Sequence, residues 1–299
     1  MPEVILHHYE TSPFGTAMRL ALGLKGISWK SVEAPMIAPK PDLSALTGGY
    51  ERIPVLQIGA DIYCDTDCIT DALEAYKPEP SLYPAPLGRS GKLIALWSGS
   101  SWFMPAVGTA LGTDPSVVSE EFWNDRKTRF GMNPKTFLPA VPHLTAQFHA
   151  GAAKLETALA DGRDFIGGDC AGHADFALWV NIHFVRFAGI VAADFAHVIE
   201  AWYGRVEAIG HGSFEEWIGE QAIEHAKQND PINGCSVPTD SGFSEGQQVA
   251  IKTDSPDPAI VTGTLVGLDD SRISISRTSD ATGEVHVHFP RLGQVLMPA

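Results

Sequence analysis

The chain has 299 residues, which exceeds one typical domain and predicts two or three folding units. Hydrophobic residues make up 44% of it and charged residues 19%, the composition of an ordinary globular protein with a core of its own. The formal net charge of −15 argues against nucleic acid or an anionic membrane as the main partner.

Four cysteines are scattered along the chain. Cys64 and Cys68 flank a predicted strand-to-helix junction, and neither a second close pair nor a histidine completes a metal set, so no metal site is expected. So few cysteines suit a reducing cytoplasm. Residues 1–10 also lack the basic segment and long apolar core of a signal peptide.

Residues 4–9 predict a buried strand, and the apolar spacing that follows predicts a helix ending near Gly26. Pro13 suits the first turn of that helix, where its missing N–H does no harm. Ser12 therefore lies at the helix start, facing unsatisfied N–H groups and the positive end of the helix dipole. Residues 29–32 predict a second strand.

Residues 53–58 and 62–64 predict two short strands joined by a tight turn. Pro54 cannot donate to a strand ladder, and it is tolerated where its peptide bond is cis and shapes a site. Asp65 and Thr66 follow where a helix begins, and their oxygens can accept its first N–H groups. The alternative interpretation of this stretch is an ordinary hairpin-to-helix transition without a binding site, which shows the same pattern.

The run from Arg52 to Leu56, followed by Asp65 and Thr66, resembles the glutathione-binding half of the cytosolic glutathione transferases. In that family the proline is cis, and a Glu or Gln followed by Ser begins the next helix. In this chain the corresponding residues are Asp65 and Thr66. They keep a carboxylate and a hydroxyl, but the distance to which these groups extend from the backbone differs from that of the family's Glu or Gln and Ser.

The first helix supports the same resemblance. Residues 1–78 have a thioredoxin-like order of strands and helices, and Ser12-Pro13-Phe14-Gly15 lies where thioredoxins carry Cys-Pro-x-Cys. In serine-type glutathione transferases a serine here, before a proline and a helix with an arginine (here Arg19), assists the thiolate of glutathione. The resemblance also implies a two-fold homodimer.

The resemblance assigns parts of glutathione to individual residues. Ser12 would be the catalytic residue, donating a hydrogen bond to the thiol; no base is visible to make it a covalent nucleophile. The Ile53 backbone, beside Pro54, would hold the cysteinyl part, while Asp65 and Thr66 would hold the γ-glutamyl end.

Arg52, with Lys40 as second candidate, would meet the glycyl carboxylate. Tyr9 and Thr11 are alternatives for the thiol contact, because the turn after the first strand can present either. The whole expected glutathione-binding set is Tyr9, Thr11, Phe14, Lys40, Arg52, Ile53, Pro54, Asp65 and Thr66.

Two functions follow from the resemblance. The first is a cytoplasmic transferase that adds glutathione, its co-substrate, to a hydrophobic electrophile, as in detoxification, or uses it for isomerisation or reduction. The alternative is a non-catalytic binding or regulatory protein of the same fold, whose C-terminal β domain recruits a partner. A dithiol oxidoreductase is disfavoured because positions 12 and 15 are Ser12 and Gly15.

Residues 79–87 are proline-rich and predict a linker, and Ser81-Leu82-Tyr83-Pro84 resembles the segment that closes the first domain in this family. Residues 88–231 predict an all-helical substrate domain. The uncharged stretch 93–113 predicts a buried helix with small residues rather than a membrane span. The expected helices cover residues 88–104, 115–130, 136–160, 173–188, 194–209 and 213–228.

Gly172 and Asp175 resemble the family's interior N-capping motif, which serves folding rather than catalysis. On the same helix, His183 and Arg186 favour a structural pair over a substrate contact.

Three aromatic residues of the first long helix are candidates for an apolar substrate pocket, although aromatic residues at helical spacing are more often core. They are Trp97, Trp102 and Phe103. Residues 120–129 favour a solvated face; alternatively, Arg126, Lys127 and Arg129 attract an anionic co-substrate.

Residues 232–299 are an extension beyond a typical glutathione transferase. Short β-rich runs separated by turn residues predict a small five-stranded barrel-like unit. His286 and His288 share one side of a strand, where surface or partner-facing histidines are favoured over a metal site. The expected strands cover residues 248–253, 260–267, 272–276, 284–289 and 295–297.

Overall fold

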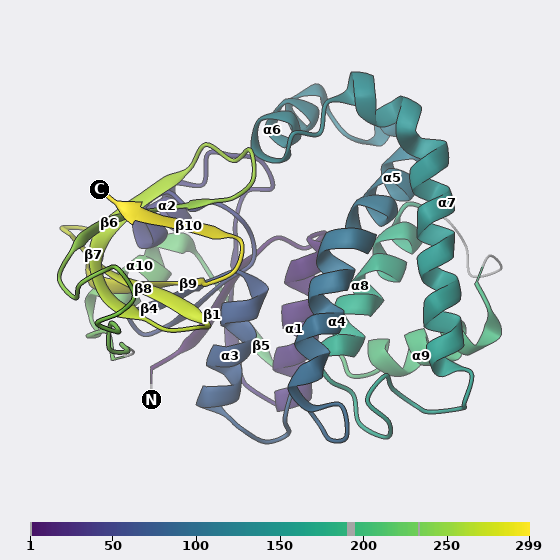
Figure 1. The fold of residues 1–299 in the computed structure, drawn as a ribbon, viewed down its shortest axis with the longest axis horizontal. Helices are drawn as coiled ribbons and strands as arrows, with labels where there is room; N and C mark the ends of the chain where they lie inside the picture. Colours follow the sequence, from purple (N-terminus) through teal and green to yellow (C-terminus); the bar gives the residue numbers. More distant parts are fainter. Residues whose placement is uncertain (1, 190–194, 233) are drawn as a thin grey trace.

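The computed structural model describes residues 2–189, 195–232 and 234–299 (Figure 1). Its first domain has the predicted thioredoxin-like order. β1 runs parallel to β2 and antiparallel to β3, and β3 pairs with β4. The elements are β1 (Val4–His8), α1 (Pro13–Lys25), β2 (Trp29–Glu33), α2 (Pro41–Thr47), β3 (Val55–Ile58), β4 (Asp61–Cys64) and α3 (Thr66–Tyr76).

The sheet of this domain is covered on both faces, as its strand β1 illustrates. Successive side chains of a strand point to opposite faces. Val4 and Leu6 pack in the core shared with α1, α3 and the helical domain, whereas Ile5 packs on the other side with α2. Burial on both faces explains why β1 begins with three apolar residues in succession.

The helical domain follows as expected, with α8 packed against α1 and α4 (Figure 1). The predicted interior cap is confirmed. Asp175 Oδ2 accepts the Gly172 N–H at 3.0 Å, and Oδ1 accepts the N–H of Ile166 at 2.8 Å and of the Trp202 indole at 2.9 Å. The helices are α4 (Gly91–Trp97), α5 (Phe103–Thr113), α6 (Glu120–Phe130), α7 (Pro134–Leu159), α8 (His173–Phe187) and α9 (His197–Glu207).

Two helix predictions need correction. The helix expected at 88–104 continues to Thr113, with a π-helical turn over Ser98–Trp102 between α4 and α5. The helix expected at 213–228 is wrong in its first part, because β5 (Phe214–Trp217) pairs in parallel with the edge of β2 before α10 (Gly219–Lys227) begins. Residue 194, where another helix was expected to begin, lies outside the described residues.

Within the described ranges, no helix combines the length and apolarity that crossing a bilayer requires. The expectation of a buried helix over 93–113 holds for α5, which packs against α7 and α8, and is wrong for α4, where Leu93 and Leu96 are exposed.

All five predicted strands of the extension are present, and they continue the sheet of the first domain instead of closing on themselves. β9 runs parallel to β4, and the described strands form one sheet in the order β10-β6-β7-β8-β9-β4-β3-β1-β2-β5. These strands are β6 (Gln248–Thr253), β7 (Ile260–Leu268), β8 (Arg272–Ser279), β9 (Gly283–Pro290) and β10 (Gln294–Pro298).

The extension also shares a hydrophobic core with the first domain. Leu46 and Ile62 of the first domain are fully buried in the same cluster as Val249, Ile275 and Phe289 of the extension. The curved strands of the extension wrap around α2 and α10 in Figure 1, which accounts for this common core.

A buried polar chain joins the two parts. His288 Nδ1 lies 2.8 Å from Ser274 Oγ, and His288 Nε2 lies 2.9 Å from Asp61 Oδ1. Asp61 Oδ2 accepts the Ile232 N–H at 2.9 Å, and the His288 ring stacks on Tyr63. His288 is fully buried, so the expectation of a surface-facing histidine is wrong: pairing of β9 with β4 carries its ring into the core.

We expect His288→Leu to destabilise the protein by about 3–5 kcal/mol, because it removes the ring nitrogen that lies 2.9 Å from the buried Asp61 Oδ1 and puts an apolar side chain in its place. Glu284→Gln, at an exposed position of the same strand, is the control and is expected to stay within about 0.5 kcal/mol of wild type. Denaturant unfolding measures both values. Equal midpoints for the two variants would contradict the role of this chain.

A second prediction concerns pH. Burial lowers the pKa of His173 to about 4, from an ordinary value of about 6.5. Between these values the unfolded chain holds a proton that the folded chain does not, so stability is lost as pH falls from about 6.5 to about 4.

We expect His173→Phe to reduce the slope of unfolding free energy against pH in this window by up to about 1.4 kcal/mol per pH unit. The measurement is denaturant unfolding at a series of pH values. His143→Phe, at an exposed position of α7, is the matched control, and a His173 variant with the wild-type slope would contradict the assignment.

Candidate functional site

Ser12 lies where the sequence predicts, at the N-cap of α1. Its Oγ accepts the Gly15 N–H at 3.1 Å, and a hydroxyl that accepts one bond keeps its proton for donation. The position is tightly packed, because a Cβ on Gly15 would lie 3.1 Å from the Ser12 Cβ. Ser12 itself is 2% exposed. The neighbouring Phe14 ring packs against the Phe103 ring of α5, with 4.6 Å between the ring centroids.

The junction of hairpin and helix is built as the sequence indicates. The Ile53–Pro54 peptide bond is cis, and Asp65 caps α3 by accepting the Asp67 N–H at 3.1 Å. Asp65 has φ +75°, the one positive value at a non-glycine residue within the described ranges. Such backbone strain gathers at functional sites. Burial raises the pKa of Asp65 above its ordinary value, and Thr66 beside it is partly exposed.

The two cations expected to meet a ligand carboxylate have partners in the protein. Arg52 Nε donates to Asp257 Oδ2 at 3.1 Å, and its Nη2 donates to the hydroxyls of Thr253 and Ser255. Lys40 donates to the Pro35 carbonyl. Burial, with a smaller effect of Arg129, lowers the pKa of Lys40 to about 8.

Helix α6 lies across this region, between the helical domain and the extension (Figure 1). Asp125 Oδ1 accepts the Ala38 N–H at 3.1 Å. Arg126, paired with Asp125, lies 3.4 Å from the Tyr9 hydroxyl and 3.3 Å from the Met36 carbonyl. The helix is thus attached to the loop after β2 and to the turn before α1.

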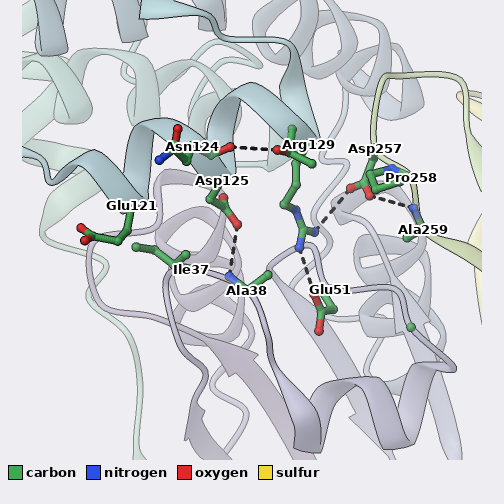
Figure 2. A pocket seen from close by; sticks show the side chains of 12 residues that line it. Ile37, Ala38, Glu51, Glu121, Asn124, Asp125, Arg129, Asp257, Pro258 and Ala259 are labelled. Atoms are coloured by element: carbon green, nitrogen blue, oxygen red, sulfur yellow. Dashed lines mark hydrogen bonds and ion pairs between the residues drawn. The ribbon is translucent and has the colours of Figure 1, made fainter.

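Arg129 continues this attachment. Its Nη1 lies 3.2 Å from Glu51 Oε2 and its Nη2 lies 3.4 Å from Asp257 Oδ2 (Figure 2). The expectation of a solvated face over residues 120–129 is therefore wrong for Arg129, which is buried, and holds for Lys127, which is exposed. The cause is that α6 reaches the first domain and the extension at once.

These contacts border a cavity of about 660 Å³ (Figure 2). Its walls come from the loop after β2 at Ile37 and Ala38, from Glu51 ahead of β3, from α6, and from residues 257–259 of the extension. Sequence reasoning missed Glu51, Asp125 and Asp257. The positive charges of Arg126 and Arg129 were the one sequence signal that indicated carboxylates nearby. The turn that contains Asp257 has the composition of an ordinary turn, so Asp257 could not be identified from it.

The predicted pocket aromatics divide between core and site. Trp102 is 1% exposed, donates its indole N–H to the Phe148 carbonyl at 3.0 Å, and belongs to the core. Trp97 stacks on Trp102 and is partly buried. Phe103, against Phe14, is the one of the three that lies beside the start of α1.

The remaining candidate residues from the sequence are held by contacts within the protein or are buried. His183 Nδ1 lies 2.7 Å from the Tyr203 hydroxyl, and Arg186 pairs with Glu200 at 2.8 Å. Burial raises the pKa of the Cys64 and Cys68 thiols well above the ordinary value, which keeps both protonated and poorly nucleophilic.

Comparisons with known proteins agree with this architecture. Models of the glutathione S-transferase N-terminal and C-terminal domains match residues 6–81 and 138–217. A GST-like protein from Pseudomonas syringae is 34% identical, with a TM-score of 0.80 and 100% of both chains covered. No curated protein matches the sequence significantly.

More distant structures share the fold over about 70% of this chain. A glutathione S-transferase from Methylobacterium radiotolerans, solved in complex with glutathione sulfonate, is 19% identical, with a TM-score of 0.52 over 71% of this chain and 96% of that one. FzlA from C. crescentus is 21% identical, with a TM-score of 0.53 over 69% of this chain and 88% of that one.

We expect Arg129→Met to destabilise the protein by about 3–5 kcal/mol, because it leaves the carboxylates of Glu51 and Asp257 with one partner fewer in a buried place. Amide hydrogen exchange of residues 120–130 should speed up at the same time, since α6 loses an attachment. Lys127→Met, at an exposed position of α6, is the control. Identical exchange in both variants would show that α6 is held by other contacts.

Proposed function

We propose, since the chain belongs to the glutathione S-transferase family, that it binds glutathione and activates its thiol for attack on a hydrophobic electrophile. The observation that carries the proposal is the Ser12 hydroxyl, whose oxygen is fixed by the Gly15 N–H at the start of α1. A thiolate beside it would receive the hydroxyl proton in a hydrogen bond and lie at the positive end of the helix dipole.

One hydrogen bond from Ser12 is strong enough to lower the pKa of the glutathione thiol by a useful amount. The glutathione thiol has the cysteine reference pKa of about 8.5, and only the thiolate is a good nucleophile. Each unit by which that pKa falls requires about 1.4 kcal/mol of preferential stabilisation of the anion. A hydrogen bond to a charged group contributes roughly 1.5–3 kcal/mol, so one donor accounts for a shift of one to two units.

The remaining residues take the roles that the resemblance assigns. The Ile53 backbone pairs with the cysteinyl part, while Asp65 and Thr66 hold the γ-glutamyl end at the start of α3. Phe14 and Phe103, packed against each other, offer an apolar surface to the electrophile. The M. radiotolerans protein, solved with glutathione sulfonate, supports glutathione as the ligand class. A cytoplasmic homodimer is part of this proposal.

A second candidate is a binding or regulatory protein that does not turn over. The observation in its favour is the low exposure of Ser12, 2%, together with the attachment of α6 to the turn at Tyr9. In this function glutathione would be held without access for a second substrate, and the extension would recruit a partner.

The test is Ser12→Ala against Thr11→Ala, which removes the exposed hydroxyl that is the alternative candidate for the thiol contact. Ultraviolet titration should show the pKa of bound glutathione returning by one to two units toward the value of the free thiol in the Ser12 variant only. The rate of conjugation of a hydrophobic electrophile at pH 7 should fall about 8- to 25-fold, the corresponding loss of thiolate.

Wild-type protein that binds glutathione without lowering its thiol pKa would favour the second candidate. An unchanged pKa and rate in the Ser12 variant would exclude serine assistance. Protein that ignores glutathione at millimolar concentration would exclude both functions.

A further inference from the structure

The sheet that the described strands form ends at β10 on one side and at β5 on the other. β10 crosses the front of the extension in Figure 1 and pairs with β6. The unpaired side of such an edge strand presents N–H and C=O groups that can bind another strand. Charged residues commonly prevent this pairing, and the two edges of this sheet differ in that respect.

Every second residue of β10 directs its backbone groups away from β6. The Ala299 N–H donates to the Gln248 carbonyl at 3.2 Å, which places the bonded pairs at the odd-numbered residues of β10. Bonded and non-bonded pairs alternate in an antiparallel ladder, so the even-numbered residues face outward. Gln294 and Leu296 thus direct their N–H groups outward, where no described residue accepts them.

The outward edge of β10 is complementary to a second copy of itself. If two copies run antiparallel about a two-fold axis at Leu296, the Leu296 N–H of each copy donates to the Leu296 carbonyl of the other. The Gln294 N–H then meets the Pro298 carbonyl of the second copy. Because Pro298 has no N–H of its own, this register leaves no outward N–H of the strand without an acceptor.

The side chains of β10 fit the same arrangement. Val295 lies opposite Met297 of the second copy on one face of the sheet, and Leu296 lies opposite its own copy on the other face. Val295 is 36% exposed in the single chain, so it has apolar surface left to bury. Apolar pairs directly across two strands stabilise a sheet.

Charge favours pairing at β10 over pairing at β5. Residues 294–298 contain no charged side chain. Lys252, opposite Val295 in β6, would be three strand spacings or about 14 Å from its copy, beyond the screening length of about 8 Å. A two-fold pairing of β5 would instead place Glu215 or Glu216 directly opposite its own copy, where like charges repel.

We propose that β10 is the interface of a two-fold homodimer, in which the β10 strands of two copies pair antiparallel about Leu296 and join their sheets. The inference rests on the homodimer of the proposed function, to which it gives an interface. A contact of one short strand per copy is at the small end of specific interfaces. We therefore expect a Kd of about 1 μM or above, so that the dimer dissociates on dilution.

Sedimentation velocity over a range of protein concentrations measures the Kd of the dimer. Val295→Lys introduces a charge from each copy at the paired edge, and we expect the Kd to rise at least about tenfold. Ile260→Lys is the matched control, because Ile260 is 56% exposed at the start of β7, two strands in from that edge. Its Kd should stay within about twofold of wild type.

Gln294→Pro tests the hydrogen bonds without adding charge. It removes the outward N–H of the first residue of β10, a position where proline is tolerated in a strand, and leaves the bonds to β6 in place. We expect the Kd to rise about fivefold or more, because each copy loses one donor to the other. Thermal unfolding checks that each variant is folded, and Val295→Lys decides if Gln294→Pro is not.

Amide hydrogen exchange locates the contact within the chain. The Leu296 N–H faces outward in the single chain and is bonded in the proposed dimer, so its exchange should slow as the protein concentration rises. The amides of β5, at the other edge of the sheet, should exchange at the same rate at every concentration.

Three results would overturn the inference. Protein that is monomeric at every concentration contradicts it and leaves the strand to a partner of another kind. A dimer that Val295→Lys and Ile260→Lys affect equally contradicts it, while the homodimer itself remains. Exchange at Leu296 that does not depend on concentration places the dimer contact elsewhere. None of these measurements uses glutathione, so failure to bind glutathione removes the proposed reaction and leaves this inference to be decided by its own results.

Discussion

The pairing of β9 with β4 is the constraint on which the rest of the molecule depends. A thioredoxin-like sheet that ended at β4 would present an open edge, and its residues Ile62 and Leu46 would lack the apolar side chains that cover them here. Buried contacts with Asp61 fix this pairing in register, because a slip of one residue would carry the His288 ring out of the core.

The attached extension brings the turn around Asp257 to the margin of the candidate site. Helix α6 reaches the same margin from the helical domain, and Arg129 joins both to Glu51. The region that a ligand would enter is therefore walled by three parts of the chain that lie far apart in sequence. The structures from C. crescentus and M. radiotolerans share the fold over 69% and 71% of this chain.

Local patterns in the sequence predict the elements but not their long-range pairing. Ser12, Pro54 and Asp65 are recognised because each has a local backbone role that its residue type reveals. The strand at Phe214–Trp217 escapes prediction because only the open edge of β2 makes it extended. His288 and Asp257 escape for a related reason: a histidine in a strand and an aspartate in a turn are ordinary until the sheet order places them against Asp61 and Arg52.

The order of the strands also has a consequence for biosynthesis. β4 leaves the ribosome more than 220 residues before its partner β9, since Asp61 pairs with His286. At about 5–20 residues per second, the nascent first domain waits roughly 10–45 s with that flank uncovered. During this interval the growing chain is a natural client for holding chaperones, and maturation is completed only after translation has passed the final hairpin.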